Sequence, residues 1–235
     1  GVGVYLLRSP AEASAPIQAT PVALSQDPLP TSSPTQAEAL VESTSTAPTQ
    51  QLPAVESGEV VYQIVQAESQ VSFAIDEILR GDPFTAVGTT DQVAGEVAID
   101  FEQARVQLGS IQVNARTLRT DSSTRDRVIS NQILQTESYE FITFEPTSIS
   151  GLPDTFDPGQ EITFQITGNL TIRDITQAVI FDATVKYVSQ ERLEGVASAI
   201  VLRSDYQIVI PEVPSVADVS DEVSLEIRFV AERKY

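Results

Sequence analysis

The chain has 235 residues, a length that suits one or two domains, with 33 acidic and 14 basic residues and a net charge of −19. This charge argues against nucleic-acid binding, which relies on lysine and arginine displacing counterions from phosphates. It argues equally against adhesion to an anionic membrane through a basic face. Because the chain has no cysteine and no histidine, thiolate chemistry, disulfides and histidine-dependent catalytic sites cannot be built from it. We expect no cofactor and no nucleic-acid partner.

The first residues, "GVGVYLL", are mostly apolar and are followed by Arg8 and Pro10. Seven residues are too few to cross a bilayer, which takes about 20. We interpret them as the end of an export signal or a membrane anchor, which predicts an extracytoplasmic protein in the periplasm or at the cell surface. A terminus with a few chance apolar residues is the alternative.

A segment rich in proline, serine, threonine, alanine and glutamine follows and extends to Ser57. Eight of the fourteen prolines lie in residues 1–57, and no helical or strand period is sustained there. Such a segment buries too little apolar surface to offset the entropy of ordering it. We therefore predict a disordered tether over 1–57 and a folded domain over 58–235.

Within the folded domain the apolar residues recur at every second position, as they do in half-buried antiparallel strands. Five runs show this alternation clearly, and four weaker runs bring the total to about nine strands. The clear runs are 71–76, 93–101, 161–172, 179–187 and 223–232, and the weaker ones are 59–65, 107–117, 140–149 and 192–203.

One short helix is expected between these runs. Asp121 or Ser122 can cap its start, Ile129 and Ile133 lie one turn apart, and Glu137 and Ser138 can end it. A single short helix cannot cover the apolar faces of nine strands, so those faces must cover one another in a sandwich or a closed barrel. Because several runs reach ten or more residues, we predict an all-β antiparallel barrel of about eight or nine strands.

A barrel of this size is either filled by its own side chains or hollow enough for one small ligand. In the run "RLEGVASAIVL" one face carries Leu193, Gly195, Ala197, Ala199 and Val201, whose small side chains favour a hollow interior. The alternative is that Val196, Ile200 and Leu202 form the inner face. Alternation predicts the following barrel lining: Val71, Phe73, Ile75, Val97, Ile99, Phe101, Ile111, Val113, Phe164, Ile166, Leu170, Phe181, Val185, Leu225, Ile227 and Phe229.

The domain resembles the YceI-like family over about 61–231. "YQIVQAESQVSFAIDEIL" is similar to the family's opening pair of strands, and "AVGTTDQVAGEVAIDF" to its Gly-x-Ile-x-Phe-Asp strand. "TRDRVISNQILQTESYEFITFEPTSI" resembles its Arg-Asp helix and the strand that follows, and "ITGNLTIRDITQAVIFDATV" its Gly-x-Leu-Thr-Ile-Arg hairpin. "RSDYQI" and "VSDEVSLEIRFVA" are similar to its closing segments. Glu140, Asp174, Ala178 and Gln207 depart from the usual Pro, Gly, Pro and Gly, which affects the predicted turns and not the fold.

The resemblance implies a bacterial, extracytoplasmic, lipocalin-like barrel whose interior takes the isoprenoid or acyl chain of an amphiphilic lipid. It implies no catalytic residues. We therefore expect a non-catalytic lipid-binding protein whose ligand contacts the predicted lining. The alternative is a filled barrel that acts as a structural module or recognises another protein at its surface.

Four arginines, Arg116, Arg119, Arg125 and Arg127, fall within twelve positions of an otherwise acidic chain. They have two interpretations. Arg125 follows Asp121 by four residues, a favourable helical ion pair, and the others would then meet acids on neighbouring strands. Alternatively, Arg125 and Arg127 together bind the diphosphate or carboxylate head group of the lipid, since arginine suits bidentate contacts to phosphate.

Acidic residues offer weaker candidates for other chemistry. Asp218, Asp221 and Glu222 lack the spacing and the glycine of an EF-hand loop, so we expect no metal site. A hydrolase or isomerase that uses Asp100 with Glu102, or Asp174 with Asp182, would need these carboxylates at a shared cleft. They lie on the polar faces of predicted strands instead, and we expect no catalysis.

Overall fold

A computed structural model describes residues 9–14, 16–22, 58–212 and 215–235. The described residues form thirteen strands of one sheet, in which every pairing is antiparallel. The strands are β1 (Glu59–Ile64), β2 (Gln70–Leu79), β3 (Asp82–Thr90), β4 (Val93–Ala94), β5 (Glu96–Asp100), β6 (Arg105–Leu108), β7 (Ile111–Asn114), β8 (Phe141–Ser150), β9 (Glu161–Ile172), β10 (Ile175–Ser189), β11 (Arg192–Leu202), β12 (Val216–Ala217) and β13 (Glu222–Arg233).

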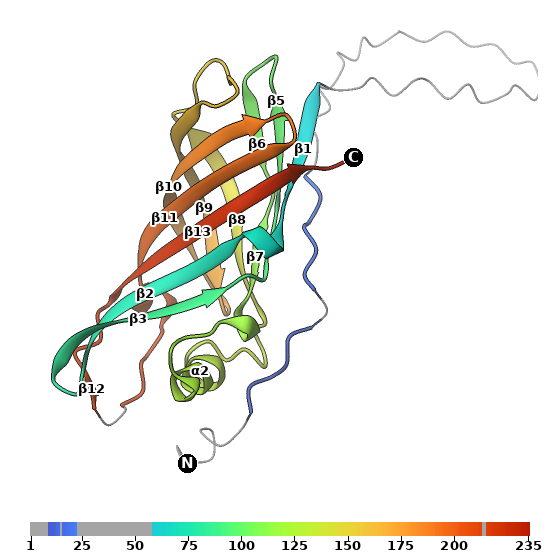
Figure 1. The fold of residues 1–235 in the computed structure, drawn as a ribbon. Coiled ribbons are helices and arrows are strands. Elements are labelled where there is room, and N and C mark those ends of the chain that lie inside the picture. Colours follow the sequence, from blue (N-terminus) through green and yellow to red (C-terminus); the bar gives the residue numbers. More distant parts are fainter. Residues whose placement is uncertain (1–8, 15, 23–57, 213–214) are drawn as a thin grey trace, which may run out of the picture.

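The sheet curls round and closes on itself (Figure 1). Its hydrogen-bonded path runs β4-β7-β8-β9-β10-β11-β13-β1-β5-β6, and β2 with β3 continues from β13. The two ends of this path belong to one hairpin, because Gly95 alone separates β4 from β5 and two residues separate β6 from β7. The Gly109 amide donates to the Glu96 carbonyl at 2.8 Å across this gap. The prediction of an all-β, lipocalin-like antiparallel barrel is confirmed.

All nine predicted runs contain strands, although the run 107–117 ends in a helical turn over 115–117, and β3 and β12 were not predicted. In β3 the residues that pair with inward positions of β2 are Phe84, Ala86 and Gly88. Two of these three are small, so the alternation of apolar and polar residues is too weak to see. β12 has only two residues.

The helical segments are short. They are η1 (Gln66–Glu68), η2 (Ala115–Thr117), α2 (Ser123–Val128), the wider turn η3 (Ile129–Ile133) and η4 (Arg203–Tyr206). The predicted cap is present, since the Ser122 hydroxyl accepts the Arg125 amide at 3.4 Å. The predicted end at Glu137 and Ser138 is too late, because Gln135 already has a left-handed φ of 50°. No helix among the described residues has the length and hydropathy to cross a membrane.

Residues 9–14 and 16–22 lie in extended form along one side of the barrel, from the α2 end toward β1 (Figure 1). Ile17 is buried, and its carbonyl accepts the Gln66 side-chain amide at 2.9 Å. The Val22 amide donates to a Glu96 carboxylate oxygen at 3.2 Å. This part of the predicted tether therefore contacts the body, while 1–8 and 23–57 lie outside the described residues.

Glu140 binds the N-terminal part of this segment through Ser14. Its carboxylate accepts the Ser14 amide at 2.7 Å, the Ser14 hydroxyl at 2.6 Å and the Asn114 amide at 3.0 Å, and it pairs with Arg116 at 2.8 Å. Burial alone would raise the pKa of the Glu140 carboxyl. The hydrogen bonds from Ser14 and Asn114 and the charge of Arg116 outweigh burial and hold that pKa below its usual value of 4.5.

We expect the docking of residues 12–14 and 16–17 to weaken at acidic pH. A carboxyl whose pKa is lowered by folding contributes stability above its unfolded pKa and loses it as the pH falls through the lowered value. Glu140→Gln should remove about 1–2 kcal/mol of this local stability at neutral pH, because the ion pair is lost. Hydrogen exchange of residues 12–14 and 16–17 measures it. In the variant, protection should be lower at neutral pH and should change less between neutral and acidic pH than in the wild type. If protection depends equally on pH in the variant and in the wild type, the role assigned to Glu140 is contradicted.

Candidate functional site

The barrel encloses an apolar cavity. The volume of this cavity is about 220 Å³, and almost all of its lining is apolar. An apolar cavity of about 150 Å³ already suffices to stay dry and bind benzene or xenon. The interior is therefore hollow, as the small inward residues predicted.

The structure places fifteen of the sixteen predicted lining residues around this cavity, all except Ile75. Their role in binding a ligand stays a prediction. Ile75 pairs with Val223 and Ala86, further along β2 than Phe73. There β2 leaves the barrel as part of the β2–β3 hairpin (Figure 1), so its inward residues no longer reach the cavity.

The sequence analysis missed about as many lining residues as it found. Most of the missed residues on strands lie beside predicted lining residues, on the same strand or on the neighbouring one. Examples are Phe144 on β8, Ile162 and Ile172 on β9, and Ala183 on β10. All four lie within the predicted runs, where the same alternation places them on the inward face. Leu118, Leu152 and Phe156 come from connections without any period, and no sequence signal identified them.

On β11 the two alternatives for the inner face are resolved. Leu193 and Ala197 line the cavity, and Ala199 and Val201 are buried. Ile200 is 67% exposed, so the alternate residues face outward. The inner face of β11 is the one with small side chains, and this leaves space inside the barrel.

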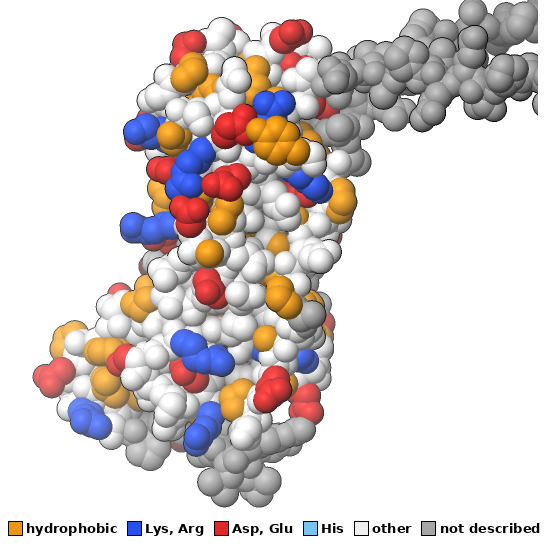
Figure 2. Space-filling view, turned by 45° about the vertical axis from the view of Figure 1, so that its right-hand side comes forward, with side chains coloured by type: hydrophobic (Ala, Val, Ile, Leu, Met, Phe, Trp, Pro, Cys, Tyr) orange, Lys and Arg blue, Asp and Glu red, His pale blue; other side chains and the backbone are white. Residues whose placement is uncertain are grey.

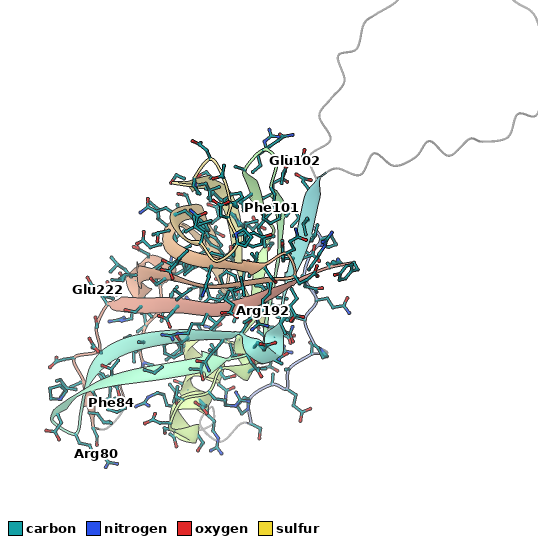
Figure 3. All side chains as sticks on the ribbon, turned by 45° about the horizontal axis from the view of Figure 1, so that its top comes forward. Arg80, Phe84, Phe101, Glu102, Arg192 and Glu222 are labelled. Atoms are coloured by element: carbon teal, nitrogen blue, oxygen red, sulfur yellow. The ribbon has the colours of Figure 1, made fainter. Side chains whose placement is uncertain are left out.

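Aromatic side chains lie at the end of the barrel opposite α2. The ring of Phe101 lies 4.9 Å from that of Tyr187 and meets the Phe156 ring edge-on at 6.2 Å, centroid to centroid. Figure 3 shows Phe101 at this end and Phe84 on the hairpin at the other. Burial raises the pKa of Tyr187, and burial does the same for Tyr62, whose hydroxyl donates to the Gln190 carbonyl at 3.0 Å. Both hydroxyls stay neutral at physiological pH.

Packed helical turns and one arginine lie at the α2 end. Ile133 and Leu134 pack on the apolar cluster that includes Tyr206 and cavity-lining residues such as Phe144. The Arg173 guanidinium donates to the Ile133 carbonyl at 3.3 Å and to the Tyr206 carbonyl at 2.6 Å. These contacts tie η3 and η4 to the β9–β10 turn.

Of the described residues, no lysine or arginine lines the cavity. Glu96 is among the lining residues, but Lys234 pairs with its carboxylate at 2.7 Å. Glu226 is likewise paired, with Arg228 at 2.7 Å. On the face drawn in Figure 2, acidic and basic side chains are intermingled. The cavity thus offers dispersion and burial to a ligand, and no fixed positive charge.

Of the two interpretations of Arg125, its contacts support the structural ion pair. It pairs with Asp121 one turn earlier, donates to Glu77 at 3.0 Å, and its guanidinium carbon lies 5.3 Å from the centroid of the Phe84 ring. Arg127 is exposed, and neither arginine lines the cavity. The head-group role predicted for this pair has no support from their placement.

The other two arginines hold the backbone that follows β7. Arg116 donates to the Thr136 carbonyl at 2.8 Å as well as to Glu140. Arg119 donates to the carbonyls of Arg116 and Leu118 at 2.9 and 2.7 Å. Their cluster therefore fixes the connection between β7 and α2.

Two of the four carboxylates considered for catalysis serve local structure. Asp100 accepts the backbone amides of Glu102 and Gln103 in the β5–β6 turn, at 2.9 and 3.0 Å. Asp182 accepts the Gln165 amide at 2.9 Å. Within the described ranges, no three acidic side chains gather as metal ligands.

A closed antiparallel barrel with an apolar cavity and without a charged anchor inside it defines a lipocalin-like binding domain. The model of the YceI-like domain family matches residues 62–231, and this chain belongs to that family. No curated protein sequence matches the chain.

Solved structures share the fold at low sequence identity. A polyisoprenoid binding domain from Saccharophagus degradans has a TM-score of 0.59 and 12% identity, over 74% of this chain and 98% of that one. BcnA of Burkholderia cenocepacia has a TM-score of 0.56 and 17% identity, over 71% and 98%. The YCEI protein of Campylobacter jejuni has a TM-score of 0.52 and 17% identity, over 63% and 85%. At these identities the likeness shows the fold alone.

Proposed function

We propose that this protein binds a long-chain isoprenoid or similar amphiphilic lipid inside its barrel and sequesters or carries it without chemical change. The apolar cavity of about 220 Å³ is the observation that carries this proposal. Membership of the YceI-like family supports it, as does the polyisoprenoid-binding function that one structural neighbour's name states.

Chain burial alone supplies enough free energy for useful affinity. Each buried CH₂ contributes about 0.8 kcal/mol, so about ten of them contribute about 8 kcal/mol. That corresponds to a Kd of about 1 µM before the costs of association are subtracted. A longer chain, or methyl branches that fill the cavity better, would compensate those costs.

The lipid's head group would contribute little to selectivity, because no basic side chain of the described residues lines the cavity. We expect geranylgeraniol and its diphosphate to bind with similar affinity, within about threefold, since neither gains a buried ion pair. Both affinities can be measured by competition against a fluorescent straight-chain polyene fatty acid. A diphosphate that binds far more tightly would restore the head-group role of the arginines.

The direct test is native mass spectrometry of the protein purified gently from its own host. We expect a bound lipid mass that organic extraction removes and that added isoprenoid restores. A protein that carries no lipid, and takes up neither isoprenoid nor fatty acid, would contradict the proposal. That result would favour the alternative, a module that recognises a partner at its surface.

We also propose an extracytoplasmic location, with the N-terminal segment as an export signal or membrane tether. The composition of residues 9–57 supports it, since alanine, proline, serine and threonine are abundant there. Cell fractionation with protease treatment of intact cells tests this proposal. Recovery of the full-length protein in the cytosol would contradict it.

A further inference from the structure

Two inward glycines of the barrel wall, unlike Gly168 and Gly195, would meet only side chains of neighbouring strands if they carried a methyl group. Gly88 on β3 pairs with Phe73 on β2, and the ring of Phe73 lies against it. A methyl group at Gly88 would overlap this ring, with its carbon 2.6 Å from Phe73 Cζ. Phe73 itself lines the cavity.

The second position is Gly95, between β4 and β5. A methyl group there would overlap the Cδ1 atom of Ile111 and lie 3.2 Å from that of Ile64. Both isoleucines line the cavity. As at Gly88, the nearest atoms belong to side chains and not to backbone.

We propose that Gly88 and Gly95 set the width of the barrel cavity, and thereby decide how bulky a lipid chain it accepts. The inference rests on the proposed function. Each glycine gives a large side chain room to lie against the wall, so that the side chain leaves the centre of the barrel open. A side chain at either position would push Phe73 or Ile111 inward, because the wall behind them is closed by paired strands.

The backbone does not require glycine at these two positions. Neither has a positive φ, in contrast to Gly81, Gly151 and Gly159. Glycine inside a strand lowers stability by about 0.5–1 kcal/mol relative to alanine. The two residues thus keep the cavity wide at some expense of stability.

Gly168 is also a glycine of the barrel wall, but a methyl group there would meet backbone as well as a side chain. A methyl group at Gly168 would lie 2.6 Å from the Glu145 carbonyl oxygen as well as against the Phe144 ring. The backbone would therefore have to move to make room for a side chain at Gly168. Gly168 is therefore needed for close strand packing, and it is not suited to a test of cavity width.

The inference is tested with Gly88→Ala and Gly95→Ala, and with Gly58→Ala as the matched control. At Gly58 the nearest atom to an added methyl would be Glu102 Cδ at 3.9 Å. Xenon binding measures the cavity without any lipid. Competition against the fluorescent polyene fatty acid then compares geranylgeraniol, which is methyl-branched, with a straight-chain alcohol of similar length.

In Gly88→Ala and Gly95→Ala we expect less bound xenon, an unchanged or higher melting temperature, and about tenfold weaker binding of geranylgeraniol relative to the straight-chain alcohol. Gly58→Ala should match the wild type. Adding Phe73→Leu to Gly88→Ala should restore the affinity for geranylgeraniol, because the displaced ring is gone.

Unchanged xenon binding and chain preference in both folded variants would overturn the inference. So would a loss of stability with equal loss of both alcohols, which would make the glycines necessary for folding only. If the wild type binds neither alcohol, the proposed function fails, and xenon binding still decides whether the two glycines set the cavity width.

Discussion

Arg125→Ala will lower the free energy of unfolding by about 2–3 kcal/mol. Glu77 is only 7% exposed at its side chain, and Arg125 pairs with it at 3.0 Å. Removing one partner of a buried ion pair leaves the other charge uncompensated, which costs about 3–5 kcal/mol when both are fully buried. We expect less here because the Arg125 side chain is 18% exposed and water reaches it.

The same arginine connects three elements, which adds to the effect. Its guanidinium reaches Glu77 on β2, Phe84 on β3 and Asp121 before α2. The variant should therefore loosen α2 from the β2–β3 hairpin, and hydrogen exchange in both should increase along with the global loss of stability.

Arg127→Ala is the matched control, because it makes the same change two residues along the same helix at an exposed position. We expect its effect in urea denaturation to stay within about 0.5 kcal/mol. The double variant Glu77→Leu with Arg125→Met should recover much of the lost stability, since it removes both buried charges. Equal losses in Arg125→Ala and Arg127→Ala would contradict the role assigned to the ion pair.

The two variants also separate the interpretations of the arginine cluster. If Arg125 and Arg127 contact a head group, both should weaken binding of geranylgeranyl diphosphate more than of geranylgeraniol. We expect no such difference from either. The contacts of Arg125 are made to the protein, and the charge of Arg127 lies outside the cavity.

Alternation along the strands was sufficient to predict the barrel and fifteen of the residues that line its cavity. It identified Phe101 just after β5, Phe164 on β9 and Phe229 on β13 as inward, and all three line the cavity. It failed on β3, where Ala86 and Gly88 face inward and leave hardly any apolar signal. The feature that hid this strand from sequence analysis is the one that leaves room for the Phe73 ring.

Contacts between residues distant in sequence could not be predicted. The pair Asp121–Arg125 follows from helical spacing, but its extension to Glu77 joins residues 48 positions apart. Likewise, the composition of residues 9–22 predicts disorder, yet Glu96 accepts the Val22 amide and Glu140 accepts both the backbone amide and the hydroxyl of Ser14. Which carboxylates lie within reach is decided by the closed barrel and not by local pattern.

Ala183→Phe will abolish lipid binding while the fold persists. Ala183 is 1% exposed, lines the cavity from β10, and lies between Phe164 and Ala197 on the neighbouring strands. An added ring there has only the cavity to occupy. We expect affinity for geranylgeraniol to fall at least about a hundredfold, since several buried CH₂ contacts at about 0.8 kcal/mol each are lost.

The matched control is Ile180→Phe, which adds an aromatic ring on the same strand at a side chain that is 53% exposed. It should bind lipid as the wild type does. Overpacking can cost about 1–3 kcal/mol, so circular dichroism and the melting temperature must show that Ala183→Phe is folded. If it is not, Ala197→Val makes a smaller intrusion from β11 and should weaken binding about tenfold. A folded Ala183→Phe protein that binds lipid normally would place the ligand outside the barrel, since the added ring would occupy the cavity.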